Sequence, residues 1–436
     1  MAAMCDRHEG EIVDAVAADF GTRSAQETRL AELFMVRVGV RHAQRHLRAW
    51  MRPRGVPTPL YLWPGTSRVL RQPLGVVGVI SPWNDPVQLA LLPAVAALAA
   101  GNHVLLKPSE LTPRTSALLE RLVAQHFAPE EFAVVNGGPD IGHEFSRLPF
   151  DHLFFTGSTA VGRKIALSAA EKLTPCTLEL GGKSPALIHA DADIATVAPR
   201  LLTGKLLNAG QTCIAPDYVL APSDRIDELV AEIGRTVAAM YPMLGDNPDY
   251  TSIINERHYG RLTALLEDAR RKGARVVALD RDSASGVGGA RKMPPTLLVG
   301  VNDGMAVMQE EIFGPLLPIE SYSTLDEAIG RINARQRPLA LYMFGGDRAA
   351  RARVLHETTA GGVTIDDTLW HFSNEALPFG GVGASGIGAY HGERGFLTFT
   401  HQKAVFVQAR FALTWTLRPP YGKRFETVLK LLKKIA

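Results

Sequence analysis

The feature that most constrains the fold of this chain is a regular alternation of short apolar segments with longer helical segments. Segments such as GVVGVIS (75–81) and HLFFTG (152–157) are apolar, rich in β-branched or aromatic residues, and followed by stretches with helical periodicity. In this first series we predict strands over 75–81, 103–108, 132–137 and 152–157, and helices over 87–100, 113–127 and from about 158. Such an alternation predicts a parallel α/β sheet covered by helices.

A second series with the same alternation begins after PCTLELGGKSPALI (175–188), which we interpret as a junction. Its helices are predicted near 193–210, 224–240 and 256–272, and its strands over 274–279, 316–322, 339–344 and 361–366. Residues 280–291 are predicted to form an exposed, mobile loop. Two α/β domains with an active site between them are the simplest interpretation.

Composition and charge exclude several classes of protein. The formal charge of +3, from 47 basic and 44 acidic residues, is too small and too evenly spread for a nucleic-acid-binding protein. Three widely spaced cysteines exclude a disulfide framework and a CxxC zinc site, so no metal site is predicted. The most apolar run, 89–100, is shorter than the roughly 20 residues of a membrane span. With no visible signal peptide, the sequence predicts a cytoplasmic protein without a transmembrane anchor.

Three glycine-rich segments resemble phosphate-binding motifs. GxGxxG at Gly381, Gly383 and Gly386 follows no strand and opens no helix, and GGKS (181–184) lacks the first glycine of a P-loop, so we reject both. The third segment follows a predicted strand and opens a helix, whose free N–H groups favour a phosphate. A simple helix N-cap by Ser158 or Thr159 is the alternative. This segment comprises Gly157, Ser158, Thr159, Ala160, Val161 and Gly162.

Several polar residues stand where apolar segments end. Cys213, in NAGQTCIAPD, is flanked by turn-forming residues, and backbone N–H groups there are expected to lower its pKa, although a small buried core residue is the alternative. Cys176 is interpreted as a core residue and Cys5 as exposed. Glu179 stands inside an apolar strand, which suggests either a buried ion-pair partner or a general base. Three further polar residues follow predicted strands, where ligands of parallel sheets gather: Asn84, Lys107 and Glu110.

Taken in order, these segments resemble the aldehyde dehydrogenase superfamily. GQTCIAPDYVL (210–220) and LPFGGVGASG (377–386), followed by YHG, resemble its class 3 branch, which includes fatty aldehyde dehydrogenases. Within that branch the chain most resembles bacterial coniferyl aldehyde dehydrogenases. The matching motifs are SPWN (81–84), KPSE (107–110), FTGSTAVG (155–162), ELGGK (179–183), GQTC (210–213), EEIFGP (310–315) and LPFGGVGASGIG (377–388).

The resemblance implies a role for each catalytic candidate. Cys213 matches the nucleophile that attacks the aldehyde to give a thiohemiacetal and, after hydride transfer, a thioester. Glu179 matches the general base that activates water for hydrolysis, a task suited to a carboxylate whose pKa is raised by apolar surroundings. The Asn84 amide and the Cys213 backbone N–H match the oxyanion donors.

The resemblance also implies a dinucleotide site. Gly157–Gly162 match the helix start beside the pyrophosphate, Lys107 and Glu110 match contacts to the adenosine ribose, and Glu311 matches a ligand of the nicotinamide ribose, with Phe313 packing nearby. A carboxylate at 110 favours the free hydroxyls of NAD over a 2′-phosphate. Class 3 relatives often accept both cofactors, so NADP is left open.

The chain departs from the family pattern near the catalytic residues. Asp85 stands where relatives usually have an aromatic residue lining the substrate tunnel, and it is expected either to disfavour long alkyl substrates or to point elsewhere. Asp366 and Asp367 stand where Asn-Asp is usual, and the extra acid is expected to raise the pKa of Cys213.

The resemblance implies an α/β fold of two Rossmann-type parallel-sheet domains with a small oligomerisation arm. We predict a dinucleotide-binding domain over 1–182 with arm strands near 60–72, a catalytic domain over 183–395, and a C-terminal strand and amphipathic helix over 396–436.

The resemblance also implies two partners. One is an aldehyde substrate, aromatic or phenylpropanoid, with a medium-chain or fatty aldehyde as the alternative. The other is a second copy of the chain in a homodimer. The basic amphipathic helix (423–436) is predicted to cover the protein's own surface or a partner subunit, with weak contact to an anionic membrane as the alternative. An acyltransferase is disfavoured because Glu179 is present, and a non-catalytic family member is disfavoured because Cys213, Glu179 and Asn84 are all present.

Overall fold

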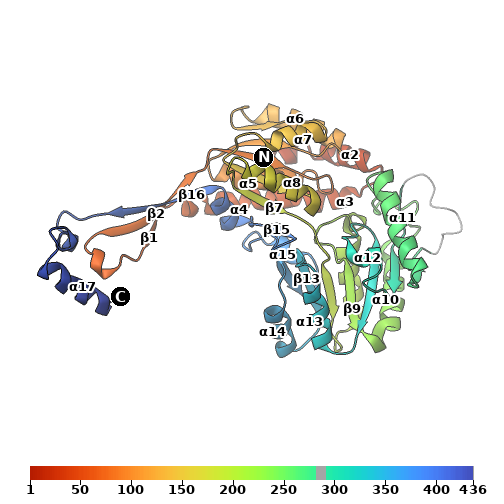
Figure 1. Ribbon diagram of the computed structural model, residues 1–436. Helices are drawn as coiled ribbons and strands as arrows, with labels where there is room; N and C mark the ends of the chain where they lie inside the picture. Colours follow the sequence, from red (N-terminus) through yellow and green to blue (C-terminus); the bar gives the residue numbers. More distant parts are fainter. Residues whose placement is uncertain (281–290, 436) are drawn as a thin grey trace.

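The computed structural model describes residues 1–280 and 291–435. Its body contains two sheets, and a long ribbon leaves one side of this body (Figure 1). Of the predicted loop over 280–291, residues 281–290 lie outside the described part. In the described residues no helix combines the length and the apolar character needed to cross a membrane.

The first sheet has six strands, which are parallel except for the short edge strand β15 (Gly386–Ile387). In spatial order they are β15 (Gly386–Ile387), β7 (Cys176–Glu179), β6 (His152–Thr156), β3 (Val76–Ile80), β4 (His103–Lys107) and β5 (Phe132–Val134). The chain runs outward from β3 to β5 and then returns to β6, on the other side of β3. The carboxyl ends of β3 and β6 therefore flank the point where strand order reverses, which is where ligands bind in open α/β sheets.

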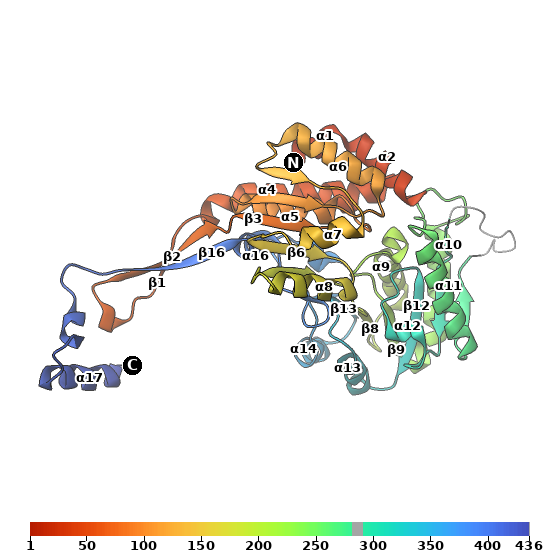
Figure 2. The same ribbon diagram turned by 45° about the horizontal axis from the view of Figure 1, so that its top comes forward.

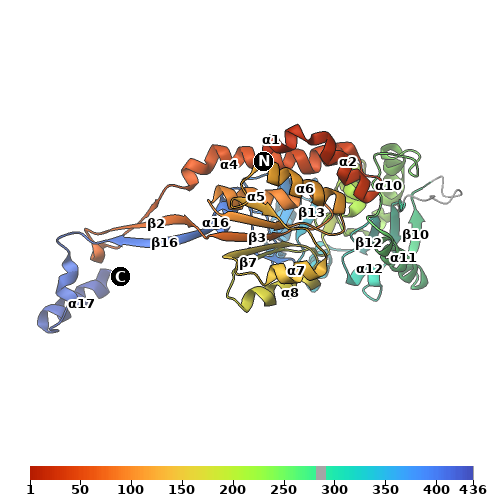
Figure 3. The ribbon, with the colours of Figure 1, turned by 90° about the horizontal axis from the view of Figure 1, so that it is seen from above.

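Helices cover both faces of this sheet. α5 (Gln88–Ala99) and α6 (Pro113–His126) lie on one face, and α7 (Pro139–Ser146) and α8 (Thr159–Ala170) lie on the other (Figure 3). α5 is apolar on nearly all sides because it packs against strands β3 and β4, and also against α4 (Met35–Trp50) and α16 (Gly392–Thr398). A short helix whose whole circumference is buried needs no polar face.

The N-terminal helices form a further layer over α5 and α6 (Figure 2). They are α1 (Ala2–Arg7), α2 (Glu9–Phe20), α3 (Ala25–Glu27), a π-helical turn (Thr28–Phe34) and α4. The prediction that Cys5 is exposed is wrong: the side chain is 2% exposed, because it lies on the inward face of α1. Burial raises the pKa of its thiol to about 11.

The second sheet has seven strands, all parallel except β10. Their spatial order is β10 (Arg275–Ala278), β11 (Thr296–Val299), β12 (Leu316–Tyr322), β9 (Tyr218–Pro222), β8 (Pro185–Ile188), β13 (Ala340–Phe344) and β14 (Gly362–Ile365). The helices that follow the junction are α9 (Ile194–Leu206), α10 (Ile226–Met240), α11 (Glu256–Arg271), α12 (Ala306–Gln309), α13 (Leu325–Ala334), α14 (Arg348–Glu357) and α15 (Trp370–Ser373). Four 3-10 turns complete the elements: Leu60–Leu62, Leu207–Gly210, Ser223–Arg225 and Leu413–Leu417.

The projecting ribbon is a third, antiparallel sheet of β1 (Arg54–Val56), β2 (Thr66–Pro73) and β16 (Thr400–Val407). β2 pairs with β16 along its full length, from Thr66 opposite Val407 to Pro73 opposite Thr400. At the far end of the ribbon lies α17 (Lys423–Ile435) (Figure 3). The predicted extended arm is therefore present, and the C-terminal part of the chain forms half of it.

Candidate active site

Cys213 lies on the loop between the 3-10 turn Leu207–Gly210 and β9. Two residues of this loop, Asn208 and Ala209, have left-handed backbone conformations with φ of 52° and 51°. The Asn208 side chain stabilises this shape, because its Nδ2 donates to the Gln211 carbonyl oxygen at 3.2 Å and to the Asn84 carbonyl oxygen at 2.9 Å. The second of these bonds joins the Cys213 loop to the segment that follows β3.

The electrostatic environment of the thiol is the opposite of the expected one. We predicted that backbone N–H groups would lower the pKa of Cys213, but burial by the surrounding protein raises it well above its ordinary value. Glu311, Asp85 and Glu179 raise it further, and the backbone N–H offsets only part of this. A partly buried thiol whose pKa is raised by desolvation and by three acids is favoured in its neutral form.

Glu179 is the last residue of β7, opposite Gly386 in the neighbouring strand. The residue is 3% exposed, and within the described part of the chain neither carboxylate oxygen has a hydrogen-bond partner. Burial raises the pKa of this carboxyl well above its usual value of 4.5. A carboxylate held without partners in apolar surroundings retains its capacity to accept a proton from water.

Asn84 and Asp85 follow β3 and are both buried. The Asn84 Nδ2 donates to the Asp85 Oδ2 at 3.1 Å, and the Asp85 Oδ1 accepts from the Arg23 Nη2 at 2.7 Å. Of the two alternatives for Asp85, the structure shows the second, because its carboxylate is directed toward Arg23.

Asp366 is not among the acids that contribute most to the raised pKa of Cys213. Its carboxylate pairs with Arg351 at 2.7 Å and accepts from the Gly345 N–H at 2.9 Å. Asp367 accepts from the Thr368 N–H. Neighbours in sequence at the end of a strand point in different directions, so the sequence position of Asp366 did not place it at the thiol.

On the cofactor side, the predicted glycine segment opens α8. Ser158 is the N-cap, and its side chain accepts from the Val161 N–H at 3.4 Å, so the capping alternative is present in the structure. Gly162 packs on Leu180 so closely that a Cβ would lie 2.5 Å from a methyl carbon. Capping by the Ser158 side chain uses one N–H of the first turn and leaves others for a ligand.

Lys107 and Glu110 lie together at the carboxyl end of β4. The Lys107 Nζ donates to the Glu110 Oε2 at 3.0 Å, with the lysine side chain 4% exposed and the carboxylate 39% exposed. Lys107 is the last residue of its strand, so both side chains stand at the same edge of the sheet as Asn84 and Gly157.

Glu311 reaches the same region from the second sheet. Its carboxylate occupies the space where a side chain of Gly181 would begin, since a Cβ there would lie 1.9 Å from the Oε2 atom. Burial, followed by the neighbouring Asp217, raises the pKa of Glu311 to about 8. Phe313, with φ of 50°, packs edge-on against Trp83 at a ring distance of 5.4 Å.

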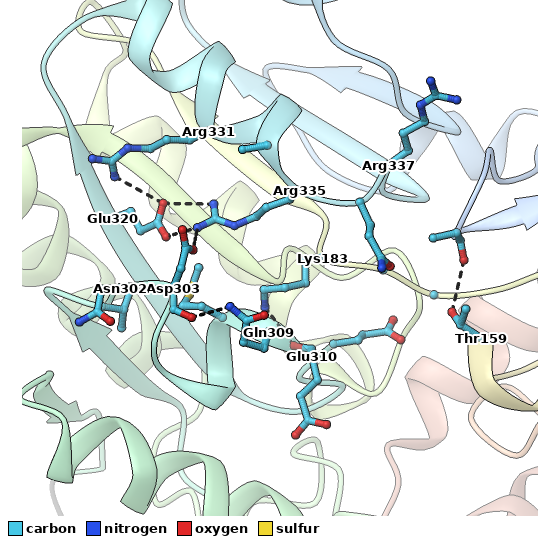
Figure 4. A pocket seen from close by; sticks show the side chains of 18 residues that line it. Thr159, Lys183, Asn302, Asp303, Gln309, Glu310, Glu320, Arg331, Arg335 and Arg337 are labelled. Atoms are coloured by element: carbon cyan, nitrogen blue, oxygen red, sulfur yellow. Dashed lines mark hydrogen bonds and ion pairs between the residues drawn. The ribbon is translucent and has the colours of Figure 1, made fainter.

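A cleft of about 700 Å³ opens beside these residues, within the usual range for small-molecule sites. Thr159 lies on one side of the cleft, and Lys183 and Glu310 lie across from it (Figure 4). Ala384 and Glu311 also line the cleft. Three arginines that no sequence motif marks also line the cleft: Arg331, Arg335 and Arg337. Arg331 and Arg335 pair with Glu320, an interaction that no local motif marks.

A model of the aldehyde dehydrogenase family matches residues 1–405. The chain belongs to this family, and it is an NAD(P)-dependent aldehyde dehydrogenase. Coniferyl aldehyde dehydrogenase of Pseudomonas sp. strain HR199 is 50% identical over 433 residues, which are 99% of this chain and 89% of that protein.

Solved structures of the family agree with this fold. The substrate-bound state of AldH from Staphylococcus aureus is 39% identical, with a TM-score of 0.93, and the match covers 99% of this chain and 93% of that one. An aldehyde dehydrogenase of Mycobacterium tuberculosis complexed with NAD+ is 32% identical, with a TM-score of 0.82, over 94% of this chain and 84% of that one.

The residues present fit a dinucleotide cofactor of this family. The start of α8 offers N–H groups at the strand-order reversal, and the missing Cβ of Gly181 makes room for the Glu311 carboxylate beside the cleft. Thr159 at the start of α8, Gly181 and Glu311 all line the same cleft.

Replacing Glu311 by Gln is expected to lower the pKa of the Cys213 thiol, because this acid is the largest cause of the raised pKa after burial. In a background with Cys5 and Cys176 replaced by Ala, alkylation by iodoacetamide reports Cys213 alone. Its pH profile should move to lower pH in Glu311→Gln, with the clearest difference above about pH 8, where Glu311 carries its charge. Glu310→Gln, half-exposed and paired with Arg261, is the matched control and should leave the profile in place. Identical profiles for both variants would contradict the assignment.

Proposed function

We propose that this enzyme oxidises an aromatic or phenylpropanoid aldehyde, similar to coniferyl aldehyde, to its carboxylic acid through a covalent intermediate on Cys213. The observation that supports this reaction is the placement of Cys213, Asn84 and Glu179. The Cys213 loop is hydrogen-bonded to the Asn84 carbonyl oxygen, and the charge of Glu179 contributes to the raised pKa of the thiol. The substrate class is supported by the 50% identity with a coniferyl aldehyde dehydrogenase along nearly the whole chain.

Cys213 is the nucleophile in this proposal. After its proton has passed to solvent, the sulfur attacks as thiolate and forms a bond to the aldehyde carbon, and the carbonyl π electrons move to the oxygen, which gives a thiohemiacetal anion. The Asn84 side-chain amide and the Cys213 backbone N–H donate hydrogen bonds to this oxygen. Such donors are worth about 3–4 kcal/mol in comparable sites because they act where charge develops.

The second half of the reaction depends on Glu179. A bound nicotinamide cofactor would supply the hydride acceptor; loss of hydride from the former aldehyde carbon, with re-formation of its C=O bond, would leave a thioester on Cys213. Glu179 takes a proton from water, the resulting hydroxide adds to the thioester carbon, and the C–S bond breaks to release the acid and the thiolate. The raised pKa of Glu179 brings its basicity closer to neutral pH, where a general base is most effective.

NAD is the proposed preferred cofactor. The Glu110 carboxylate at the edge of the sheet suits the free hydroxyls of an adenosine ribose, whereas a 2′-phosphate would meet its negative charge. We assign Lys107, Glu110 and Gly157–Gly162 to the adenosine and pyrophosphate half, and Glu311 and Phe313 to the nicotinamide half.

We further propose the domain division 1–182, 183–395 and 396–436, a cytoplasmic location, and a homodimer built through the arm. The dimer is supported by large apolar side chains exposed on the arm: Trp63 (55%), Phe411 (82%) and Trp415 (51%). An exposed apolar group of this size on a projecting ribbon is typical of a protein–protein contact.

The substrate proposal predicts a kcat/KM for coniferyl aldehyde at least about tenfold above that for decanal, a difference of roughly 1.4 kcal/mol in transition-state binding. The measurement is NADH formation over an aldehyde panel. Cys213→Ala should reduce the rate by about 10³-fold or more, and Cys176→Ala is the matched control. Activity that survives in Cys213→Ala would overturn the mechanism, and a preference for decanal would overturn only the substrate class.

Glu179→Gln is expected to form the thioester but to hydrolyse it slowly. Rapid mixing should therefore give a burst of NADH near one equivalent per Cys213, followed by steady-state turnover about 10²-fold or more below the wild type. In the wild type, turnover should fall as the pH decreases, because the raised pKa of Glu179 leaves this base protonated first. Loss of the burst together with turnover would show that Glu179 acts before the thioester.

The dimer proposal predicts a mass near twice 47.2 kDa by sedimentation equilibrium. Replacing both Phe411 and Trp415 by Asp should give the monomer mass, since it removes apolar surface and places charge in the contact. Leu355→Asp, on an exposed site of α14 that is 48% accessible, is the control and should stay dimeric. A wild-type monomer at micromolar concentration would be decisive against the arm-mediated dimer.

A further inference from the structure

A buried group of charged side chains lies behind the active site, and the mechanism does not use it. Arg23 and Glu32 have fully buried side chains, and the side chain of Asp85 is 10% exposed. Arg23 and Glu32 belong to the N-terminal segment, far in sequence from Asp85. No motif singles out either of them, yet both contact the residues that surround Asn84.

Arg23 contacts Asn84 once directly and once through Asp85. Its Nη1 donates to the Asn84 carbonyl oxygen at 2.6 Å, and its Nη2 donates to the Asp85 Oδ1 at 2.7 Å. The other oxygen of Asp85 accepts from the Asn84 Nδ2 at 3.1 Å. The guanidinium fork therefore fixes the Asn84 backbone directly and its side-chain amide through Asp85.

Glu32 fixes the chain just beyond these residues. Its Oε2 accepts from the Val87 N–H at 2.6 Å and the Gln88 N–H at 3.2 Å, at the first turn of α5. Its Oε1 lies 3.4 Å from the Arg23 Nη1. Glu32 is carried by the π-helical turn Thr28–Phe34, which places it beneath α5.

Glu27 links the same N-terminal segment to the nucleophile loop. Its Oε2 accepts from the Asn208 N–H at 3.1 Å and from the Thr251 Oγ1 at 3.1 Å. The Asn208 side chain in turn donates to the Asn84 carbonyl oxygen, which also accepts from Arg23. One short segment thus contacts the supports of both Asn84 and Cys213.

A buried cluster of this kind is not an efficient way to stabilise a fold, because desolvating the charges offsets much of their attraction. What this cluster provides is a fixed orientation of the groups that it contacts. With one N–H of the Asn84 amide directed to Asp85, the amide cannot rotate freely, and its second N–H is left for a ligand. The aromatic residue usual at position 85 has no carboxylate with which to accept this bond.

We infer that Arg23 is a positioning residue for the oxidation of aldehydes: together with Asp85, it orients the Asn84 amide toward the substrate oxygen. This inference rests on the proposed role of Asn84 as an oxyanion donor. It assigns the N-terminal segment a part in transition-state stabilisation, and Asp85 becomes a partner of Arg23 rather than a group that selects substrates in the tunnel.

The test is a double-mutant cycle on kcat/KM for aldehyde oxidation, with Arg23→Met, Asn84→Ala and the double variant. Asn84→Ala should lose about 10²-fold, and Arg23→Met about tenfold or more, with the KM for NAD unchanged. Because Arg23 acts through Asn84, the double variant should lose no more than about threefold beyond Asn84→Ala. Arg29→Met, an exposed arginine of the same segment paired with Glu9, is the matched control and should retain wild-type kcat/KM.

A second readout separates positioning from general damage. Alkylation of Cys213 by iodoacetamide forms no oxyanion, so its rate at a pH where the thiol is ionised should be the same in Arg23→Met and the wild type. Arg23→Lys keeps the charge but not the fork, and should recover part of the loss. If Arg23→Met does not fold, the same cycle is run with Arg23→Lys.

The outcomes are distinguishable. If Asn84→Ala keeps its activity, the proposed oxyanion role fails. If Asn84→Ala is impaired and the losses multiply in the double variant, the inference is overturned and Arg23 is only a support of the fold. A slower alkylation rate that parallels the loss of kcat/KM in Arg23→Met also overturns it.

Discussion

The hydrogen bond from the Asn208 side chain to the Asn84 carbonyl oxygen is the contact on which the site depends. Asn84 follows a strand of the first sheet, and Asn208 belongs to the loop that leads into the second sheet, so this bond joins the segments that carry the proposed oxyanion donor and the nucleophile. The left-handed conformations of Asn208 and Ala209 are sustained around it. Strained backbone of this kind persists where surrounding contacts over-determine it.

Desolvation governs the electrostatics of the site more than any single charge does. It is the first cause of the raised pKa of Cys213, Glu179 and Glu311, and these acids also raise the pKa of the thiol. Desolvation of this kind favours the neutral forms of the thiol and of both carboxyl groups.

Much of the fold could be predicted from the sequence, because uninterrupted apolar segments mark buried parallel strands. β3, β4, β6, β12 and β13 lie within a residue or two of their predicted ranges. The prediction missed several short strands, among them β8, β9 and β11, which have only four or five residues and so present a short apolar pattern. The candidate catalytic residues were accessible for a related reason: each stands in a short local motif.

What escaped prediction depends on contacts between distant segments. Arg23 and Asp85 are separated by 62 positions, and Glu27 and Asn208 by 181, so no local spacing marks either contact. The burial of Cys5 and the direction of Asp366 likewise depend on how elements pack. The thiol's pKa was predicted with the wrong sign because local N–H groups can be read from a loop sequence, whereas burial cannot.

The arm also has a consequence for the order in which the protein is made. β2 is complete at Pro73, but its partner β16 begins only at Thr400, so residues 74–399 are synthesised while one side of β2 is without its partner. Throughout that time its N–H and C=O groups form an open edge, which is a template for pairing with other chains. The exposed charge of Arg68 on this strand is of the kind that discourages such pairing, and Arg68 lies opposite Val405 once β16 has been added. The projecting ribbon therefore gains its β2–β16 hydrogen bonds only after residues 74–399 have been synthesised.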